Sequence, residues 1–291
     1  MTAPPSPELR LTNGEIELRA PRDYGPRVTH YGFAGGPNLF GDGARASRPT
    51  PRGLWRAYGG HRLWAAPESF PETYTVDDEP PEIEAPSELR AVLRRARDPL
   101  TGLVASIELE LAPRGTEVLV RHVLTNEGDA PRRLAPWGLT VARPGGCAVI
   151  PNAEFHPQPE ALLPARTMVL WSYTDLSDRR FAFGPRFVRL RCDPARTSPT
   201  KIGFACERGW FAYVAERTAF VVRTLYEASA EYPDRGCNVE VYTEGPFCEV
   251  ETLAPLVTLV PGESALHTER WSVHANVDPD DDAALEKLAA A

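Results

Sequence analysis

The sequence predicts an all-β protein, built as one large antiparallel sandwich or barrel. Apolar and polar residues alternate with a period of two along most of the chain, and turns containing Pro or Gly separate the runs. In the run SIELELA, for example, Ile107, Leu109 and Leu111 share one face. The 30 prolines among 291 residues are spread along the chain, and each would cost a helix about 3 kcal/mol. A long series of short strands without long helices is typical of a single large β-sandwich.

The chain divides into three parts. Residues 1–8 are Pro-rich and are expected to be a flexible N-terminus. Residues 9–277 carry the strand patterns and are expected to form a single domain. Residues 278–291 begin with a helix N-cap pattern followed by alanines and leucines, which predicts a short terminal helix.

The first part of the domain combines a hairpin with two irregular stretches. Asn-Gly in LTNGEIELRA (11–20) predicts the hairpin. Residues 41–58 are rich in Gly, Pro and Arg and predict a long loop, which leads into YGGHRLW (58–64). Residues 68–88 are acidic and Pro-rich and predict a solvated surface segment.

Strands dominate from residue 89 onward. The predicted strands are 89–97, 103–112, 116–126, 167–172, 186–192, 202–206, 210–215, 218–226, 238–243, 247–260 and 266–274. His122 alternates in phase with valines and a leucine, so it is interpreted as a core histidine rather than a ligand. An irregular stretch, residues 143–166, contains His156, and Pro261-Gly262 predicts a tight turn.

Charge and composition exclude several classes of protein. The formal net charge is −8, so no basic face for nucleic acid or an anionic membrane is expected. No apolar run approaches the ~20 residues that span a bilayer, and the N-terminus lacks a signal-peptide pattern. Five cysteines without Cys-x-x-Cys spacing indicate free thiols in a reducing cytoplasm. The chain is expected to be a cytoplasmic monomer or homodimer.

No cofactor and no metal are expected. Motifs for a P-loop, a dinucleotide fold, a nucleophile elbow and a zinc protease are absent. The Gly-rich residues 36–43 lack a following helix and a lysine. The six histidines show no metal-ligand spacing, although distant positions could still meet in the fold.

The segment GGHRLW could form part of a carbohydrate-binding surface. Its two glycines permit close approach of a ligand, His61 and Arg62 offer polar groups, and Trp64 offers an apolar plate. In the alternative interpretation, Trp64 packs into the core while His61 and Arg62 face water.

Glu251 is a carboxylate in a strand that is otherwise half buried. It must therefore be solvated, paired with another charge, or used in binding or catalysis. Strand alternation places Glu249 on the same face, and Cys248, Val250 and Thr252 on the other. If the glutamate face is concave, it lines a cleft. If that face is open to solvent, both glutamates are ordinary surface residues.

Several of these segments resemble a known family. CEVETLAPLVTLVPGES (248–264) resembles the C-terminal part of galactose mutarotase (aldose 1-epimerase) proteins, where a strand with the catalytic glutamate precedes one ending in Pro-Gly-Glu. Residues 11–33 are similar to the opening hairpin of that superfamily. YGGHRLWAAPE, KIGF and ERW look closer to an uncharacterised branch, the DUF4380 proteins. The resemblance implies a galactose mutarotase-like β-supersandwich with a concave sheet that binds a sugar.

The resemblance also implies catalytic roles. Glu251 matches the general base that takes the proton from the anomeric hydroxyl. The family's main general-acid histidine follows a strand ending in Thr-Asn, which is 123–126 here, and Trp137 stands where that histidine is expected. His61 is the nearest match to the other active-site histidine and is the expected acid. His156 is an alternative from the irregular stretch.

Further residues are candidates for contacts with the sugar. Lys201 and Lys287 are the only lysines among the 32 lysine and arginine residues. Because arginine is used almost everywhere else, the lysine at position 201 is expected to serve a role that needs a compact ammonium. Lys201 and Arg179 would suit an acidic or phosphorylated sugar. The expected substrate-binding residues are Arg62, Trp64, Trp137, His156, Asp178, Arg179, Lys201 and Tyr242.

Three functions stay open. The first is an aldose 1-epimerase-like isomerase that uses Glu251 as base and His61 as acid. The second is a non-catalytic carbohydrate-binding or sensing protein on the same fold, which the missing histidine at Trp137 favours. The third is a lyase that acts on an acidic sugar in the same cleft.

Overall fold

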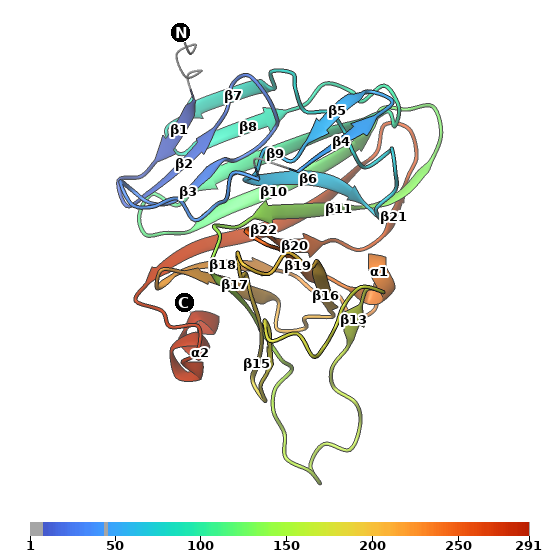
Figure 1. The fold of residues 1–291 in the computed structure, drawn as a ribbon. Helices are drawn as coiled ribbons and strands as arrows, with labels where there is room; N and C mark the ends of the chain where they lie inside the picture. Colours follow the sequence, from blue (N-terminus) through green and yellow to red (C-terminus); the bar gives the residue numbers. More distant parts are fainter. Residues whose placement is uncertain (1–7, 44–45, 291) are drawn as a thin grey trace.

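The structure is a computed structural model that describes residues 8–43 and 46–290. Within these ranges, antiparallel strands form two large sheets and two small ones (Figure 1). The prediction of an all-β antiparallel sandwich is confirmed. Apart from Glu8, the predicted flexible N-terminus lies outside the described residues.

The larger main sheet has ten strands. Its order from edge to edge is β14 (Phe181–Phe183), β15 (Phe187–Arg191), β12 (Cys147–Pro151), β17 (Trp210–Ala215), β18 (Thr218–Thr224), β22 (Ser264–Ala275), β10 (Val118–Asn126), β9 (Leu103–Leu111), β8 (Arg90–Arg94) and β7 (Glu82–Ser87).

The second main sheet has seven strands. Its order is β13 (Met168–Leu170), β16 (Thr200–Phe204), β19 (Val239–Glu244), β20 (Phe247–Leu253), β11 (Arg132–Val141) and β21 (Val257–Leu259), and β6 (His61–Ala66) pairs with β11 outside this order. This is the sheet that carries Glu251 and His61.

The remaining elements are small. Three strands, β1 (Leu9–Thr12), β2 (Ile16–Ala20) and β3 (His30–Phe33), form one sheet, and β4 (Ser47–Thr50) and β5 (Gly53–Arg56) form a hairpin. The helices in the described ranges are α1 (Pro233–Gly236) and α2 (Asp282–Ala290). Neither has the length and apolar composition to cross a membrane.

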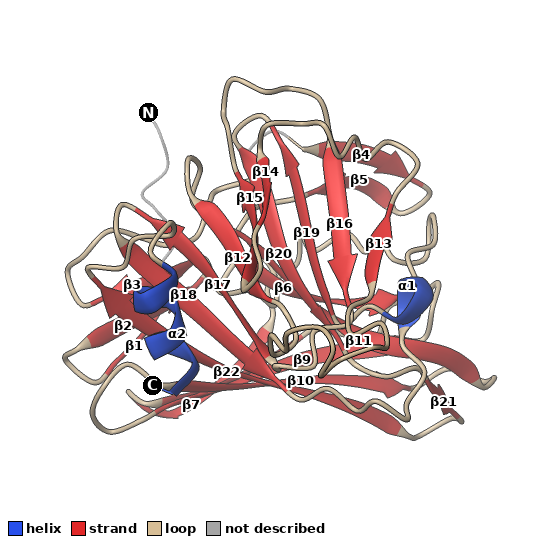
Figure 2. Ribbon diagram, turned by 90° about the horizontal axis from the view of Figure 1, so that it is seen from below, coloured by secondary structure: helices blue, strands red, loops and turns tan. Residues whose placement is uncertain are grey.

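The main apolar core lies between the two large sheets, which Figure 2 shows from below. Ile107, Leu109 and Leu111 of β9 enter this core, as the alternation predicts, and Cys248 and Val250 of β20 enter it from the other sheet. Each strand therefore presents every second residue to the core.

The register of the seven-stranded sheet decides which side chains share its outer face, the face that points away from the main core. On β11, Leu139 pairs with Glu251 on one side and with Arg62 on the other. The next residue, Thr140, pairs with Val250 and His61. Because paired residues share a face, Arg62 and Glu251 lie on the outer face, and His61 lies on the inner face with Val250.

Two predicted elements differ from the structure. The predicted loop 41–58 contains the hairpin β4–β5, which places Trp55 against Trp64 with ring centroids 5.6 Å apart. The predicted strand 247–260 is divided into β20 and β21. Pro255 lies between them, and a proline cannot donate a ladder hydrogen bond.

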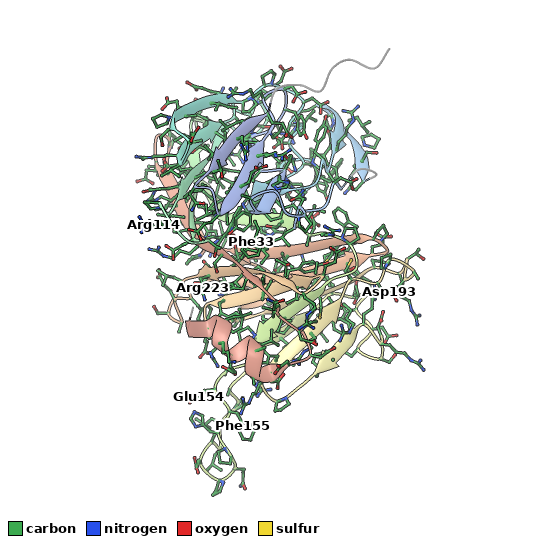
Figure 3. The ribbon with its side chains drawn as sticks, turned by 90° about the vertical axis from the view of Figure 1, so that its left-hand side faces the viewer. Phe33, Arg114, Glu154, Phe155, Asp193 and Arg223 are labelled. Atoms are coloured by element: carbon green, nitrogen blue, oxygen red, sulfur yellow. The ribbon has the colours of Figure 1, made fainter. Side chains whose placement is uncertain are left out.

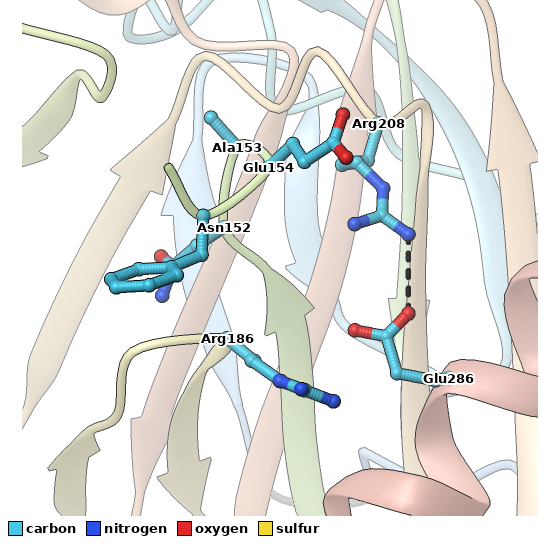
Figure 4. Close-up of a pocket in the computed structure, with 7 residues that line it drawn as sticks. Asn152, Ala153, Glu154, Arg186, Arg208 and Glu286 are labelled. Atoms are coloured by element: carbon cyan, nitrogen blue, oxygen red, sulfur yellow. Dashed lines mark hydrogen bonds and ion pairs between the residues drawn. The ribbon is translucent and has the colours of Figure 1, made fainter. Parts of the chain in front are cut away.

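A long connection projects from the body between β12 and β13 (Figure 1). Figure 3 labels Glu154 and Phe155 near its base. On the same side of the molecule, Leu285 and Leu288 of α2 pack in a second cluster with Trp210. Asn152, Arg186, Arg208 and Glu286 line a pocket of about 560 Å³ there, in which Arg208 and Glu286 are 3.4 Å apart (Figure 4). None of the predicted site residues line it.

Candidate functional site

Glu251 lies on the outer face of β20, and its side chain is almost fully buried, at 1 % exposure. Its Oε2 atom accepts a hydrogen bond from Lys201 Nζ at 2.9 Å and one from Trp137 Nε1 at 3.0 Å. The carboxylate is therefore paired, which answers the question that its position in the sequence raises.

Lys201 joins two carboxylates. Its Nζ atom lies 2.6 Å from Oε2 of Glu240, which is the cross-strand partner of Glu251. The ammonium also lies over the rings of Trp137 and Trp171, at 5.1 and 4.8 Å from their centroids. A compact ammonium with three donors fits between two acidic groups and two aromatic rings, which agrees with the retained lysine.

Burial and the neighbouring charges shift the pKa of Lys201 in opposite directions. Burial would lower the pKa of Lys201, but Glu251 and Glu240 raise it well above its usual value. Burial raises the pKa of Glu240 far above the usual range of a carboxyl, Lys201 opposes this, and the nearby Glu251 adds to it. Lys201 is therefore a permanent cation and a poor proton donor at neutral pH.

Arg62 and Glu249 form a second pair beside the first. Arg62 Nη2 donates to Glu249 Oε1 at 2.8 Å, and the guanidinium lies over the Trp64 ring at 4.4 Å. Burial raises the pKa of Glu249, and Arg62 opposes that rise. The outer cluster is defined as Arg62, Lys201, Glu240, Glu249 and Glu251. It sets two cations against three carboxyls, so the protein favours keeping one carboxyl protonated.

Several donors on this face have no protein acceptor. Arg62 Nε and Nη1, Trp64 Nε1 and Trp55 Nε1 are buried and make no hydrogen bond within the described part of the chain. Trp55 and Arg62 are neighbours, with 5.8 Å between the guanidinium carbon and the ring centroid. Unpartnered buried donors are rare in native proteins and need an explanation such as water, an ion or a ligand.

A pocket opens at one end of the same face. It has a volume of about 790 Å³, and Val141, Tyr242 and Phe247 contribute to its lining. Val141 and Tyr242 are the two cross-strand partners of Glu249, so the pocket borders the outer cluster. A pocket of this size can hold a small ligand.

His61 is not part of this cluster. It is fully buried on the inner face, where Nε2 lies 2.6 Å from Nε2 of His122 and Nδ1 lies 2.8 Å from Thr140 Oγ1. Burial, with His122 close by, holds the pKa of His61 well below 6.5. The expected pairing of His61 with Glu251 is not formed, because the sheet separates successive residues of β6 onto opposite faces. In the alternative interpretation, Trp64 packs into the core while His61 and Arg62 face water. Trp64 is buried in an apolar cluster, but His61 and Arg62 are buried as well, so the alternative is wrong for the two polar residues.

The other predicted residues divide into two groups. Trp64, Trp137 and Tyr242 lie on the outer face, and their contacts with a sugar stay a prediction. His156 is on the projecting connection, with a 53 % exposed side chain 4.0 Å from Glu154. Asp178 forms an ion pair with Arg180 at 2.7 Å.

Arg179 is exposed. No described hydrogen bond or ion pair joins it, His156 or Asp178 to the outer cluster, so the structure does not bring these three to Glu251.

Sequence reasoning missed Glu240, Trp55 and Trp171. Glu240 alternates in phase with Tyr242 in VEVYTE, which is a signal that it shares the outer face. Its proximity to Lys201 could not be found, because that pairing joins β16 to β19 across a long stretch of chain. Trp55 was missed because residues 41–58 were predicted to be a loop, so its side chain was not assigned to a face.

The fold is a β-sandwich of the galactose mutarotase-like type, and its seven-stranded sheet has a polar and aromatic outer face. A galactose mutarotase-like protein from Lactobacillus casei superposes with a TM-score of 0.59 at 11 % identity, over 92 % of this chain and 100 % of that one. A galactose mutarotase related enzyme from Lactobacillus acidophilus gives 0.55 at 9 % identity, over 94 % and 99 % of the chains.

The same fold also occurs as part of a larger protein. A TPR-domain containing protein from Parabacteroides distasonis superposes with a TM-score of 0.61 at 15 % identity, over 91 % of this chain and 46 % of that one. No protein-family model and no curated protein matches the sequence. At these identities the likeness establishes the fold alone.

Proposed function

We propose that this chain binds a small neutral carbohydrate on the outer face of the seven-stranded sheet, next to Tyr242 and Glu249. The observation that carries the proposal is the pocket at Val141 and Tyr242, which borders the Arg62–Glu249 ion pair and, behind it, the buried unpartnered donors of Trp55, Arg62 and Trp64. A sugar hydroxyl accepts from such donors and donates to a carboxylate, while tryptophan and tyrosine rings cover the C–H faces of the sugar.

The charge balance of the outer cluster favours a neutral ligand. Both of its cations are paired with carboxylates, and Glu244 adds a further acid to the neighbouring pocket. An acidic or phosphorylated sugar would meet this negative charge, and no cation among the described residues of the cluster or of the pocket lining is free to pair with it. The geometry therefore argues against the lyase alternative and against a phosphorylated ligand.

The fold neighbours named as galactose mutarotase-like support a sugar as the ligand. The resemblance to the DUF4380 branch rests on YGGHRLWAAPE, KIGF and ERW and stays a prediction. Binding without catalysis is the preferred form of the proposal, because all six histidines lie in the described ranges and none is in the outer cluster. Lys201, with its raised pKa, does not replace the missing acid.

Thermal-shift titration with neutral aldoses, glucuronate and glucose 6-phosphate tests the proposal. At least one neutral aldose should raise Tm, by a stability gain of about 2.7 kcal/mol at a hundredfold excess over Kd, and the charged sugars should not. Glu249→Gln and Tyr242→Ala should reduce the shift. The matched control, Arg179→Ala, should retain it, and the absence of a shift with any saccharide would overturn the proposal.

Anomer interconversion is the second candidate. Glu240, whose pKa is raised, faces the Lys201-bound Glu251, and this arrangement resembles an acid beside a base. Exchange NMR on the aldose that binds separates the two functions. A rate equal to that of buffer supports binding alone, whereas an enhancement that Glu251→Gln and Glu240→Gln both abolish supports ring opening.

A further inference from the structure

A second group of polar side chains lies on the inner face, inside the sandwich. The inner cluster is defined as His61, His122, His267 and Glu269, which come from β6, β10 and β22 and are all buried. His61, His122 and Glu269 each offer one ligand atom, and these three atoms lie within 4.8 Å of one another. No part of the proposed sugar site uses these residues.

The remaining polar atoms of these three residues are already held by neighbours. His122 Nδ1 donates to the main-chain oxygen of His267 at 3.3 Å, and His61 Nδ1 lies 2.8 Å from Thr140 Oγ1. Both contacts leave Nε2 of each ring directed at the other. Bonds of this kind to the second ring nitrogen orient histidines that bind metals in proteins.

Glu269 is oriented in the same way. Trp271 Nε1 donates to its Oε2 atom, and the hydroxyl of Thr252 donates to Oε1. His267 Nε2 lies 2.7 Å from the same hydroxyl and 3.8 Å from Glu269 Oε1. The carboxylate is therefore fixed beside the two imidazoles, with the third imidazole at its edge.

The backbone leaves room for the Glu269 carboxylate at Gly138, where any larger residue would require this carboxylate to shift. A Cβ atom on Gly138 would lie 2.6 Å from Glu269 Oε1, 3.1 Å from Thr252 Oγ1 and 3.4 Å from a carbon of the His61 ring. The residue is in the middle of β11, where glycine costs stability unless close approach requires it.

We propose that His61, His122 and Glu269 bind a divalent transition-metal ion, with Zn²⁺ as the best match. Two imidazoles and one carboxylate form a known zinc ligand set that leaves one position open. Ligands on a tetrahedral ion with bonds of about 2.0–2.1 Å are about 3.3 Å apart. The two Nε2 atoms, now 2.6 Å apart, would separate by a small ring rotation, and the metal ion would take the place of the proton between them, which moves to His61 Nδ1 and is donated to Thr140 Oγ1.

The site is independent of the proposed sugar site, from which the sheet separates it. Its ligands lie about 61 and 147 residues apart in the sequence, which is why ligand spacing did not reveal them. Because the site is buried on all sides, the ion would enter during folding and would add its binding energy to stability.

Elemental analysis of the full-length protein, expressed in zinc-supplemented medium and dialysed against chelator, is the first test. The expected result is about one zinc ion per chain. Expression in cobalt-supplemented medium should give the strong visible absorption of tetrahedral Co²⁺. A metal-free protein without this absorption would overturn the proposal, and the inner cluster would then be a chain of hydrogen bonds without an ion.

Variants locate the ion. His122→Gln and Glu269→Gln should each lower the zinc content of purified protein at least tenfold, whereas the exposed-histidine control His156→Gln should keep it. Zinc retained in both cluster variants would overturn the assignment. If the variants do not fold, the cobalt spectrum of the unaltered chain decides by itself, since nitrogen and oxygen ligands differ from thiolates in their charge-transfer bands. Thiolate bands would also overturn it.

Discussion

Arg62 and His61 are neighbours in sequence, yet they belong to two different polar clusters on opposite faces of one sheet. The outer cluster holds full charges in ion pairs, is lined by tryptophans, and leaves several donors without a protein acceptor. In the inner cluster, His61, His122 and Glu269 have a described partner for each of their side-chain polar atoms, and the imidazoles are neutral because burial lowers their pKa. The contrast indicates that donors without a protein acceptor are a sign of a ligand site. Side chains whose hydrogen bonds are all made within the protein instead form a rigid group in the interior.

The largest expected effect comes from removing the cation of the outer cluster. Lys201→Met leaves Glu240 and Glu251 buried without a counter-ion, which should lower the free energy of unfolding by about 3–5 kcal/mol. Urea unfolding measures this change. Lys287, the other lysine, is exposed on α2, and Lys287→Met should change stability by less than about 0.5 kcal/mol. Equal stability of the two variants would show that the ion pairs do not hold the outer face together.

Sequence patterns identified faces well because strand alternation is a local property. Glu249 and Glu251 do share a face, and His122 is a bonded core residue, as predicted. The same rule, applied to HRLW, assigns His61 and Leu63 to one face and Arg62 and Trp64 to the other. No strand was predicted for HRLW, and its side chains were grouped on one surface, whereas the segment is strand β6.

Pairings between distant strands were beyond local patterns. Lys201 and Glu251 meet only because β16, β19 and β20 are adjacent in the sheet. Asp178 was expected to contact the sugar, but it pairs with Arg180, two residues along its own turn. Register is set by the packing of the whole sandwich. The sequence therefore indicates that Lys201 is unusual but does not identify the carboxylates that pair with it.

The inner cluster can be tested through its backbone. Gly138→Ala should lower the free energy of unfolding by about 1–3 kcal/mol, because the new Cβ meets a carboxylate that Thr252 and Trp271 hold in place. Urea unfolding gives the change, and the saccharide-induced shift of Tm should remain. Unchanged stability would mean that Glu269 moves freely, and the contrast between a rigid interior and a ligand-facing exterior would fail.

A smaller, pH-dependent effect is expected at Glu240. Its folded pKa is raised well above the ordinary value of 4.5, so above that pH the folded state binds more protons than the unfolded state. The contribution of this group to stability therefore falls as pH rises above 4.5, by up to about 1.4 kcal/mol per pH unit until the folded pKa is reached. Glu240→Gln should remove this slope.

Urea unfolding between about pH 5 and about pH 8 measures the slope. The stability of Glu240→Gln relative to the unaltered chain should increase with pH across this range. Glu244→Gln, at an exposed position of the same strand, serves as the control and should follow the unaltered chain. Parallel curves for all three proteins would place the retained proton elsewhere in the outer cluster.

The smallest effect is expected at His156, which belongs to neither cluster. Its half-exposed ring lies near Glu154 on the projecting connection, and a surface pair of this kind contributes little. His156→Ala should change stability by less than about 0.5 kcal/mol and should leave any saccharide-induced shift of Tm as it is. A clear loss of saccharide binding would mean that the connection reaches the outer face when ligand is present. The expected acid would then come from this loop, and catalysis, rather than binding alone, would become the better account of the outer cluster.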